Sequence, residues 1–247
     1  MIETALIDAD IVAYRCAAAT ENDTEDIACF QVTEMMNRIL HETNAMQYKA
    51  FLTGSNNFRY GIYPDYKANR KDTVKPRHLE AVRAHLVSTW KAAVTDGIEA
   101  DDALGIEQCS IHDGDSVVCS IDKDLLMLPG KHYNFVKGEG RMVSPLEGLR
   151  HFYGQLILGD RSDNIPGFDG KMRLKVPKFL EEHFFFLEEA VNEWEMYNYV
   201  QDLYLDKDQM NINGRVLWIM RKADDFWQPP EKPLMEVNGQ KDDTTPL

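Results

Sequence analysis

Aspartate and glutamate side chains gather in four short segments of the sequence, each at the predicted end of a strand or helix. The segments are "LIDAD", "GIEADDALG", "SIDKDLL" and "GDRSDNIPG". Crowded carboxylates repel one another and raise one another's pKa. Hard divalent cations such as Mg²⁺ or Mn²⁺ remove that repulsion, and a pair of them can hold both sides of a phosphoryl displacement. The pattern therefore indicates metal-dependent chemistry at phosphate. The eight candidate ligands are Asp8, Glu99, Asp101, Asp102, Asp122, Asp124, Asp160 and Asp163.

Each segment, taken alone, also has a structural explanation. Asp8 could form a turn at a strand end, and the acids of "EADD" could favour a helix N-terminus through the helix dipole. Asp122 and Asp124 could cap the next turn, and "GDRSDN" could be a loop with Asx-turns. Because the same chemistry recurs at four element ends, the joint pattern favours one site.

Strand-like and helix-like patterns alternate over the first 144 residues. Strands are expected in "TALID", "YKAFLTG", "AVTD" and "SVVCSI", with a short one in "HYNF" and helical spacing in the segments between. This alternation predicts a parallel α/β sheet. Ligands bind beyond the carboxyl ends of such strands, so Asp8 and Asp122 should meet there. From Pro145 the pattern becomes mainly helical, and the last twenty residues are polar and proline-rich.

The charge of the chain is unevenly distributed. The net charge is -14, but residues 59–91 carry eight basic against three acidic residues, whereas residues 181–247 carry fifteen acidic against six basic. The stretch "FRYGIYPDYKANRKD" interleaves aromatic and cationic side chains, a pattern typical of contacts to single strands or frayed ends. It is also compatible with a solvated basic loop. A second basic cluster consists of Lys171, Arg173, Lys175 and Lys178.

Other features limit the class of protein. The four cysteines are scattered and predict reduced thiols. The sequence has no stretch typical of a membrane span or an export signal. A cytoplasmic protein without membrane contact is therefore expected.

Together these motifs resemble those of the 5′-nuclease family, which includes flap endonucleases, bacteriophage 5′-3′ exonucleases and the 5′-nuclease domain of DNA polymerase I. The matching stretches are "LIDADIVAYR", "FRYGIYPDYKANR", "GIEADDALG", "SIDKDLLML" and "GDRSDNIPG", in the family's order. No polymerase region accompanies them, as in a stand-alone phage enzyme acting in the host cytoplasm.

The resemblance implies a PIN-like α/β fold with helices around a parallel sheet. It implies a catalytic domain at 1–159 with a helical arch at about 58–91. A helix–three-turn–helix element and further helices would follow at 160–227, and a flexible tail at 228–247. The implied activity is hydrolysis of phosphodiesters near 5′ ends or flaps of DNA, in replication or recombination, with two or more Mg²⁺ or with Mn²⁺. RNA–DNA hybrids are a further candidate substrate, and the acidic C-terminal region is a candidate contact for a replication protein.

The resemblance also assigns roles to residues. Asp8, Glu99, Asp101, Asp102 and Asp122 would serve a first metal cluster, and Asp124, Asp160 and Asp163 a second. Lys67 and Arg70 match the catalytic cations of the arch, and Tyr66 could stack on a terminal base. The implied DNA contacts are Arg59, Tyr66, Lys67, Arg70, Lys71, Lys171, Arg173 and Lys175.

Two departures from the family pattern stand out. The family usually has another aspartate just upstream of its "FR" motif, where this chain has Ser55 and Asn56. Its duplex-binding hairpin normally has closely spaced glycines that hold a phosphate and K⁺. Here Gly167 and Gly170 are followed by Lys171 and Arg173, which leaves the K⁺ site in doubt.

Two other interpretations compete. In a haloacid-dehalogenase-type phosphatase, Asp8 would be the nucleophile and Asp10 the general acid, but "EADD", "DKD" and the basic stretch would be unexplained. A non-catalytic nucleic-acid-binding scaffold would fit the Ser55 departure, but clustered carboxylates without metals are costly to retain.

Overall fold

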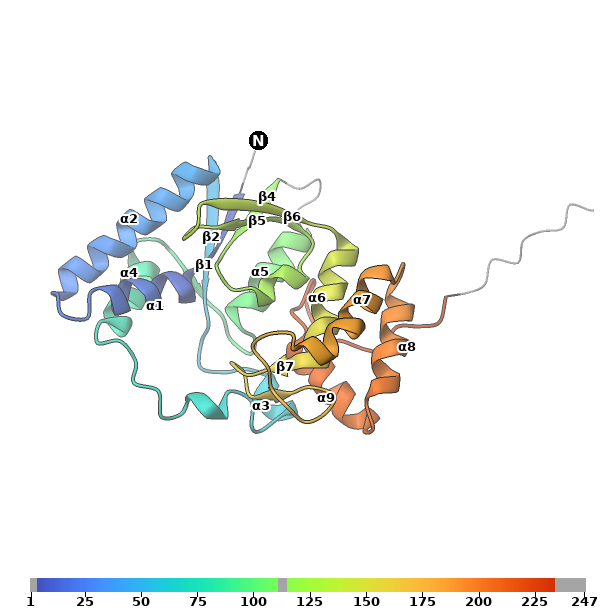
Figure 1. Ribbon diagram of the computed structural model, residues 1–247. Helices are drawn as coiled ribbons and strands as arrows, with labels where there is room; N and C mark the ends of the chain where they lie inside the picture. The colour runs from blue at the N-terminus through green and yellow to red at the C-terminus, as the bar shows by residue number, and fades with distance from the viewer. Residues whose placement is uncertain (1–3, 111–114, 234–247) are drawn as a thin grey trace, which may run out of the picture.

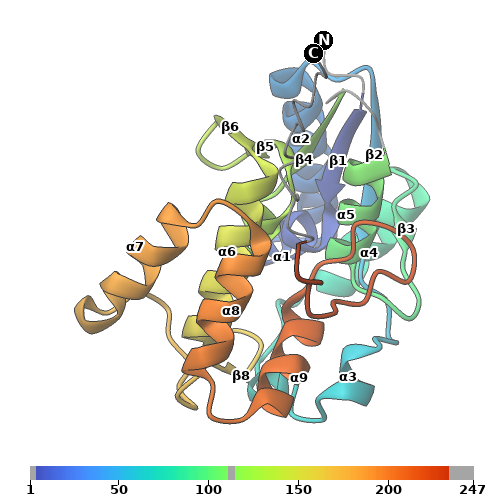
Figure 2. The same ribbon diagram turned by 90° about the vertical axis from the view of Figure 1, so that its right-hand side faces the viewer.

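The computed structural model describes residues 4–110 and 115–233, and a six-stranded sheet lies at its centre (Figures 1 and 2). The strand order is β3-β2-β1-β4-β5-β6; neighbours from β3 to β5 are parallel, and β6 is antiparallel to β5. The predicted α/β sheet is thus confirmed, with an antiparallel edge strand added. The strands are β1 (Thr4–Asp8), β2 (Gln47–Leu52), β3 (Ala93–Val94), β4 (Ser116–Cys119), β5 (Gly130–Asn134) and β6 (Glu139–Val143).

The central strands are buried on both faces, which explains their continuous apolar sequences. In β1, the side chains of Ala5 and Ile7 belong to one hydrophobic cluster and that of Leu6 belongs to another. In β4, Val117 and Val118 divide in the same way. Two cores therefore lie on opposite faces of one sheet, as the alternation of side chains along a strand requires.

Helices from different parts of the chain cover the two faces (Figure 1). One face packs against α1 (Ala9–Ala19), α2 (Glu25–Thr43) and α4 (Leu79–Ser88). The other face belongs to a core that includes α5 (Ala100–Ser110), α6 (Pro145–Leu158), α7 (Glu181–Glu189), α8 (Glu193–Leu203) and α9 (Lys207–Leu217). Helices beyond residue 160 therefore share one continuous core with the sheet.

The segment 58–91 differs from the expected helical arch. It contains the short helix α3 (Arg59–Ile62), the 3-10 turn η1 (Ala68–Arg70) and then α4, while residues 71–78 form no helix. Pro64 and Pro76 interrupt helical hydrogen bonding, and residues 69–75 between them are exposed, so they offer no buried face for packing. The middle of the arch segment, residues 71–78, is therefore a loop, whereas helices lie on either side of it.

Three short elements complete the site region. They are the 3-10 turns η3 (Asp124–Met127) and η4 (Lys178–Leu180) and the hairpin of β7 (Gly159–Asp160) with β8 (Ile165–Pro166). Residues 228–233 have no regular structure, and the rest of the predicted tail, 234–247, lies outside the described residues. Within the described ranges, no helix has the length and apolarity needed to cross a membrane.

Candidate active site

The ends of β1 and β4 bring the first carboxylates together. Asp8 ends β1 and caps α1, since its Oδ1 accepts a hydrogen bond from the amide of Ile11 at 3.1 Å. Its Oδ2 accepts from Ser120 Oγ at 2.6 Å, and Ser120 Oγ accepts from the amide of Asp122 at 2.9 Å. Because β1 and β4 are parallel neighbours, their carboxyl ends place Asp8 beside the loop that carries Asp122.

Asp122 and Asp124 are held by hydrogen bonds in the loop that follows β4. Asp122 Oδ1 accepts from the amide of Asp124 at 2.9 Å, so the two acids form a tight turn at the start of η3. Asp124 Oδ1 accepts from Gln155 Nε2 on α6 at 2.7 Å. The side chain of Asp124 is thereby oriented by a helix 31 residues further along the chain.

The β7–β8 hairpin presents two more acids. Asp160 Oδ1 accepts from the amides of Ser162 at 2.6 Å and Asp163 at 3.4 Å, the bonding pattern of an Asx-turn. Gly159 precedes this turn at a φ of +71°, and a Cβ there would lie 2.4 Å from the amide nitrogen of Gly167. Only glycine fits this close approach, which sets the position of Asp160.

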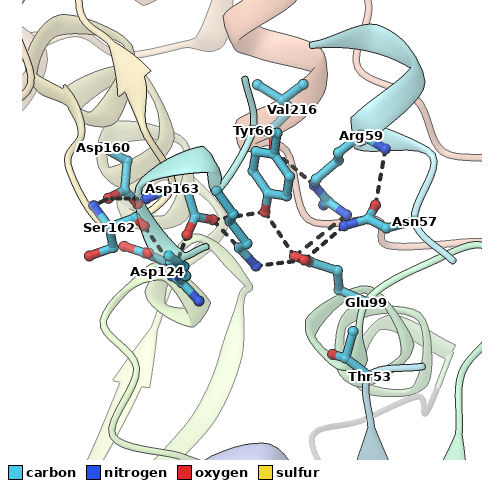
Figure 3. A network of polar contacts seen from close by, with 12 residues as sticks. Thr53, Asn57, Arg59, Tyr66, Glu99, Asp124, Asp160, Ser162, Asp163 and Val216 are labelled. Atoms are coloured by element: carbon cyan, nitrogen blue, oxygen red, sulfur yellow. Dashed lines mark hydrogen bonds and ion pairs between the residues drawn. The ribbon is translucent and has the colours of Figure 1, made fainter. Parts of the chain in front are cut away.

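Glu99 and Asp163 are joined through the arch segment (Figure 3). The Tyr66 hydroxyl lies 2.9 Å from Glu99 Oε2 and 2.8 Å from Asp163 Oδ2. Lys67 Nζ lies 2.5 Å from Glu99 Oε1 and 3.6 Å from Asp163 Oδ2, and Arg70 Nη2 lies 2.5 Å from Asp163 Oδ1. The predicted cations therefore lie directly at the predicted carboxylates.

The acids of the site strongly perturb one another. Burial raises the pKa of Asp8 to about 7. Burial also raises the pKa of Asp124 to about 9, and the charges of Asp122 and Asp160 raise it further. The pKa of Asp101 lies well above its usual value because of burial and of the charges on Asp8 and Asp122. The site thus holds more negative charge than its cations compensate, which divalent cations would relieve.

The oxygen-rich donor set fits hard divalent cations, but the side chains are not yet in coordination geometry. Within the described residues, no group of three acidic, histidine or cysteine side chains converges to hold an ion. Several carboxylate oxygens instead accept hydrogen bonds from Tyr66, Lys67 and Gln155. A divalent cation bound to the same oxygens would replace these hydrogen bonds.

Comparisons with known proteins identify the family and the fold. A family model described as the N-terminal, resolvase-like domain of 5′-3′ exonucleases matches residues 3–152. The chain belongs to the 5′-3′ exonuclease family. Solved structures from bacteriophage T5 are similar to this chain: one, of the flap endonuclease with DNA and metal ions, has a TM-score of 0.66 at 15% identity, covering 87% of this chain and 88% of that one. Another, of the T5 5′-exonuclease with zinc, has a TM-score of 0.61 at 16% identity, covering 87% and 89%.

Curated relatives share more sequence but are longer. DNA polymerase I of Bacillus caldotenax is 30% identical over 67% of this chain and 22% of its own length. The thermostable DNA polymerase I of Thermus aquaticus is 29% identical over 72% of this chain and 23% of its own length. A 5′-3′ exonuclease of Buchnera aphidicola is 28% identical over 54% of this chain and 51% of its own length. The chain thus spans under a quarter of the length of these polymerases. The expected superfamily and PIN-like fold are confirmed.

The structure corrects the expectation that Arg59 contacts DNA. Its side chain is 2% exposed, and its guanidinium donates to both oxygens of Asp102 at 2.6 and 2.8 Å. It also donates to the backbone carbonyls of Val216 and Trp218, each at 2.8 Å. The carboxylate of Asp102 is fully buried and also accepts from the amide of Met220. Arg59 and Asp102 therefore form a buried structural clamp.

Of the other predicted DNA contacts, Tyr66 and Arg173 are already engaged within the protein, whereas three lysines are open to solvent. Tyr66 is 2% exposed, so its ring does not present a face for stacking on a base. Arg173 forms a two-point ion pair with Asp169, at 2.8 and 2.5 Å, which neutralises its charge. Lys71, Lys171 and Lys175 are exposed.

Several residues that position the site were not predicted. Asn57 Nδ2 donates to Glu99 Oε1 at 2.8 Å, and Gln155 orients Asp124. A polar side chain on the buried face of an amphipathic helix is a signal that could have identified Gln155. Asp10 accepts from the amide of Thr53 at 2.8 Å and pairs with Arg83, so it is not free to act as the general acid of a phosphatase.

The two residues at the departure from the family pattern do not supply a ligand. Ser55 is exposed, and Asn56 Nδ2 donates to Asp96 Oδ1 at 2.7 Å, also at an exposed position. Thr53 lies closer to the site and its Oγ1 accepts from the amide of Ala100 at 2.9 Å, at the start of α5. The hydroxyl of Thr53, which directly follows β2, therefore helps to orient α5, the helix that carries Asp101.

Proposed function

We propose that this protein is a divalent-metal-dependent 5′-nuclease that hydrolyses phosphodiester bonds near 5′ ends or flaps of DNA. The observation that carries the proposal is the meeting of Asp8, Asp122, Asp124 and the β7–β8 acids with Lys67 and Arg70 of the arch segment. Family membership supports it, as does the likeness to a phage flap endonuclease solved with DNA and metal ions.

The metal would be held by carboxylates that are not engaged in the Arg59 clamp. Divalent cations, Mg²⁺ first and Mn²⁺ as a substitute, would neutralise charge on the reacting phosphate and activate the attacking water. Asp102 would then act by holding Arg59. The expected ligands are Asp8, Glu99, Asp101 and Asp122 for one cluster, and Asp124, Asp160 and Asp163 for the other.

Lys67 and Arg70 would act on the scissile phosphate. Both side chains lie at the carboxylates of the site, and the carbonyl of Asp163 accepts the amide of Lys67 at 2.9 Å, which fixes the backbone there. A preorganised cation stabilises negative charge that develops during reaction more effectively than a mobile one. Lys71, Lys171 and Lys175 would bind backbone phosphates further from the reacting bond.

The proposal extends to three further ligands, which are RNA–DNA hybrids, a replication protein and K⁺. RNA–DNA hybrids would be accepted if contacts are made mainly to phosphates, because such contacts carry no base information. A replication protein could bind the acidic C-terminal region through its own basic surface. A K⁺ ion at the turn of Gly167 and Gly170 would be recognised by a K⁺ dependence of duplex binding that Na⁺ does not reproduce.

The test compares 5′- and 3′-labelled duplex and 5′-flap DNA, with and without Mg²⁺, for wild type and Asp124→Asn. We expect metal-dependent release from the 5′ end that collapses in the variant, while product lengths separate exonuclease from flap cutting. Asp26→Asn, an exposed acid on α2, is the matched control and should cleave like wild type. Absence of cleavage by wild type would contradict the proposal.

A further inference from the structure

A cavity lies between α6, α7 and η3, and Figure 2 shows the two helices next to each other. Its volume of about 510 Å³ is within the range of small-molecule sites. Gly154 on α6 leaves room for the ring of Phe184 on α7, since a Cβ on this glycine would lie 2.9 Å from Phe184 Cε1. The apolar part of the lining consists of Leu126, Leu158, Phe184 and Leu187. This α6–α7 cavity therefore has the volume and the apolar walls that a small aromatic ligand needs.

Basic side chains from three elements also line the α6–α7 cavity. They are Lys123 directly before η3, Arg141 on β6 and Arg150 on α6. Arg150 donates to two backbone carbonyls at the end of α7, whereas Lys123 is exposed and has no ion-pair partner in the described part of the chain. Arg141 lies 3.8 Å from Glu147 at an exposed position, where ion pairs are weak. Against these three cations stand two acids of the lining, Glu147 and Glu188, so the cavity favours an anion.

Two polar atoms of the lining are buried without a hydrogen-bond partner among the residues that the structure describes. They are His151 Nε2 and Gln155 Oε1. Leaving such atoms unpaired is costly, and most buried polar groups in proteins are paired. Gln155 is 8% exposed and its Nε2 donates to Asp124, so its oxygen remains available to accept from a ligand. A ligand that carries N–H groups would therefore satisfy an acceptor that the protein leaves open.

The cavity is a neighbour of the candidate active site. Gln155 lines both of them, and Lys123 stands between the site acids Asp122 and Asp124 in the chain. Burial and the charges of Lys123 and Arg141 lower the pKa of His151 to about 4, so its ring is neutral and both cations act at the same place. The open positive charge of the cavity thus lies on the side of η3 and β6.

We propose that the α6–α7 cavity binds a nucleoside 5′-monophosphate. The base lies against Phe184 and donates from an N–H group to Gln155 Oε1. The phosphate, which carries about two negative charges at neutral pH, lies at Lys123 and Arg141. The choice of a nucleotide over another aromatic phosphate rests on the proposed function, because removal of single nucleotides from a 5′ end would release this ligand beside the cavity.

The test measures binding of deoxyadenosine 5′-monophosphate (dAMP) to the full chain by isothermal titration calorimetry in EDTA. Deoxyadenosine and inorganic phosphate serve as partial ligands, and each should bind at least about tenfold more weakly than dAMP, since one polar or stacking contact is worth about that much. Phe184→Leu keeps an apolar side chain but removes the aromatic face, and it should weaken dAMP binding about tenfold.

A second variant removes charge without changing the core. Arg141→Gln should weaken dAMP binding about tenfold and leave deoxyadenosine binding unchanged, because it removes a charged contact to the phosphate alone. Lys137→Gln is the matched control: Lys137 is an exposed cation of the same β5–β6 hairpin, lies 4.0 Å from Glu139 and does not line the α6–α7 cavity. It should bind dAMP like wild type.

Three outcomes would overturn the inference. Absence of dAMP binding at millimolar concentrations is the first. The second is equal affinity for dAMP and inorganic phosphate, which would identify a general anion site. The third is equal dAMP affinity in Arg141→Gln and Lys137→Gln, which would place the nucleotide elsewhere. Cleavage assays in Mg²⁺ separate the two proposals: DNA cleavage by a wild type that does not bind dAMP removes only this inference, whereas dAMP binding that Arg141→Gln weakens, without cleavage by wild type, removes only the proposed activity.

Discussion

Lys67 Nζ and Glu99 Oε1 lie 2.5 Å apart, in a site that also holds acids from the strand ends and the β7–β8 hairpin. The backbone of Lys67 is in the left-handed region, with a φ of +54°. A lysine rarely adopts this conformation without support from its surroundings, and such strain is concentrated at functional sites. The ammonium is thus a built-in counterion of Glu99, and under the proposed function it would yield to a divalent cation bound there.

Replacing Lys67 tests this counterion directly. We expect Lys67→Met to lower kcat by about a hundredfold or more, the scale seen on removing one preorganised charge-stabilising group. Single-turnover cleavage at saturating DNA measures the effect. The control is Lys91→Met, because Lys91 is an exposed lysine with the same φ of +54° and donates to the carbonyl of Ser88. An equal loss in both variants would assign the effect to backbone strain.

Gln155 should tune the metal site without binding metal. Removing its hydrogen bond to Asp124 in Gln155→Leu leaves the carboxylate without its orienting donor. Loss of such a supporting partner typically weakens metal affinity by about 10- to 100-fold. We expect the Mg²⁺ concentration for half-maximal cleavage to rise on that scale, with little change in the rate at saturating metal. An unchanged Mg²⁺ midpoint would show that Gln155 does not position Asp124.

The Arg59–Asp102 clamp should contribute to stability more than to metal binding. Removing one partner of a buried ion pair leaves an uncompensated charge and costs about 3–5 kcal/mol. We therefore expect Asp102→Asn and Arg59→Met each to lower the free energy of unfolding on that scale, measured by urea denaturation. The double variant should lose less than the sum of the two. Near-normal stability with a raised Mg²⁺ requirement in Asp102→Asn would instead make Asp102 a ligand.

The raised carboxyl pKa values predict an unusual pH dependence for the metal-free protein. The pKa of Asp124 rises from 3.8 to about 9 on folding, so the folded state binds the proton more tightly than the unfolded state. The protonated Asp124 side chain therefore stabilises the folded state. This stabilisation is fully present below about pH 4 and is lost as the pH rises through about 9. In EDTA, Asp124→Asn should therefore gain Tm over wild type as the pH increases from 5 to 9. A difference that shrinks with pH would contradict this sign.

Gly159 should be intolerant of a side chain. In Gly159→Ala, the new Cβ would lie 2.4 Å from the Gly167 nitrogen and the backbone would keep a strained positive φ. Gly170→Ala is the matched control, because Gly170 has a φ of +76° but a Cβ added there would meet no atom within 4 Å. Both should lose stability, and only Gly159→Ala should also lose cleavage activity at temperatures where it remains folded. Equal activity in both would show that the Asp160 turn tolerates displacement.

Much of the fold was readable from sequence, because strand ends and helix starts carry local signals. The meeting of Asp8 with the Asp122 loop followed from one rule about parallel sheets. Strand β6 was missed since "EGRMV" is mostly polar and exposed at the sheet edge. The family resemblance implies a helical arch at about 58–91, and the structure has helices only on either side of residues 71–78, because Pro64 and Pro76 favour a loop between them.

The buried positions of Arg59 and Tyr66 could not be predicted from the residues around them in the sequence. An arginine beside aromatic residues looks the same whether it faces solvent or lies under another helix. Arg59 can be buried because the backbone carbonyls of Val216 and Trp218, more than 150 residues away, accept hydrogen bonds from its guanidinium. Such long-range acceptors leave no mark in the stretch "FRYGIYPDYKANR".

The Arg59 clamp also bears on how the chain folds. Arg59 and Asp102 in the first half hold Val216, Trp218 and Met220 near the end of the described chain. A fragment ending at residue 159 would contain this guanidinium without two of its acceptors, and it would expose the apolar side chains of α6 that pack against α8 and α9. We therefore expect that the α/β part does not fold on its own and that thermal unfolding of the whole protein is a single cooperative transition.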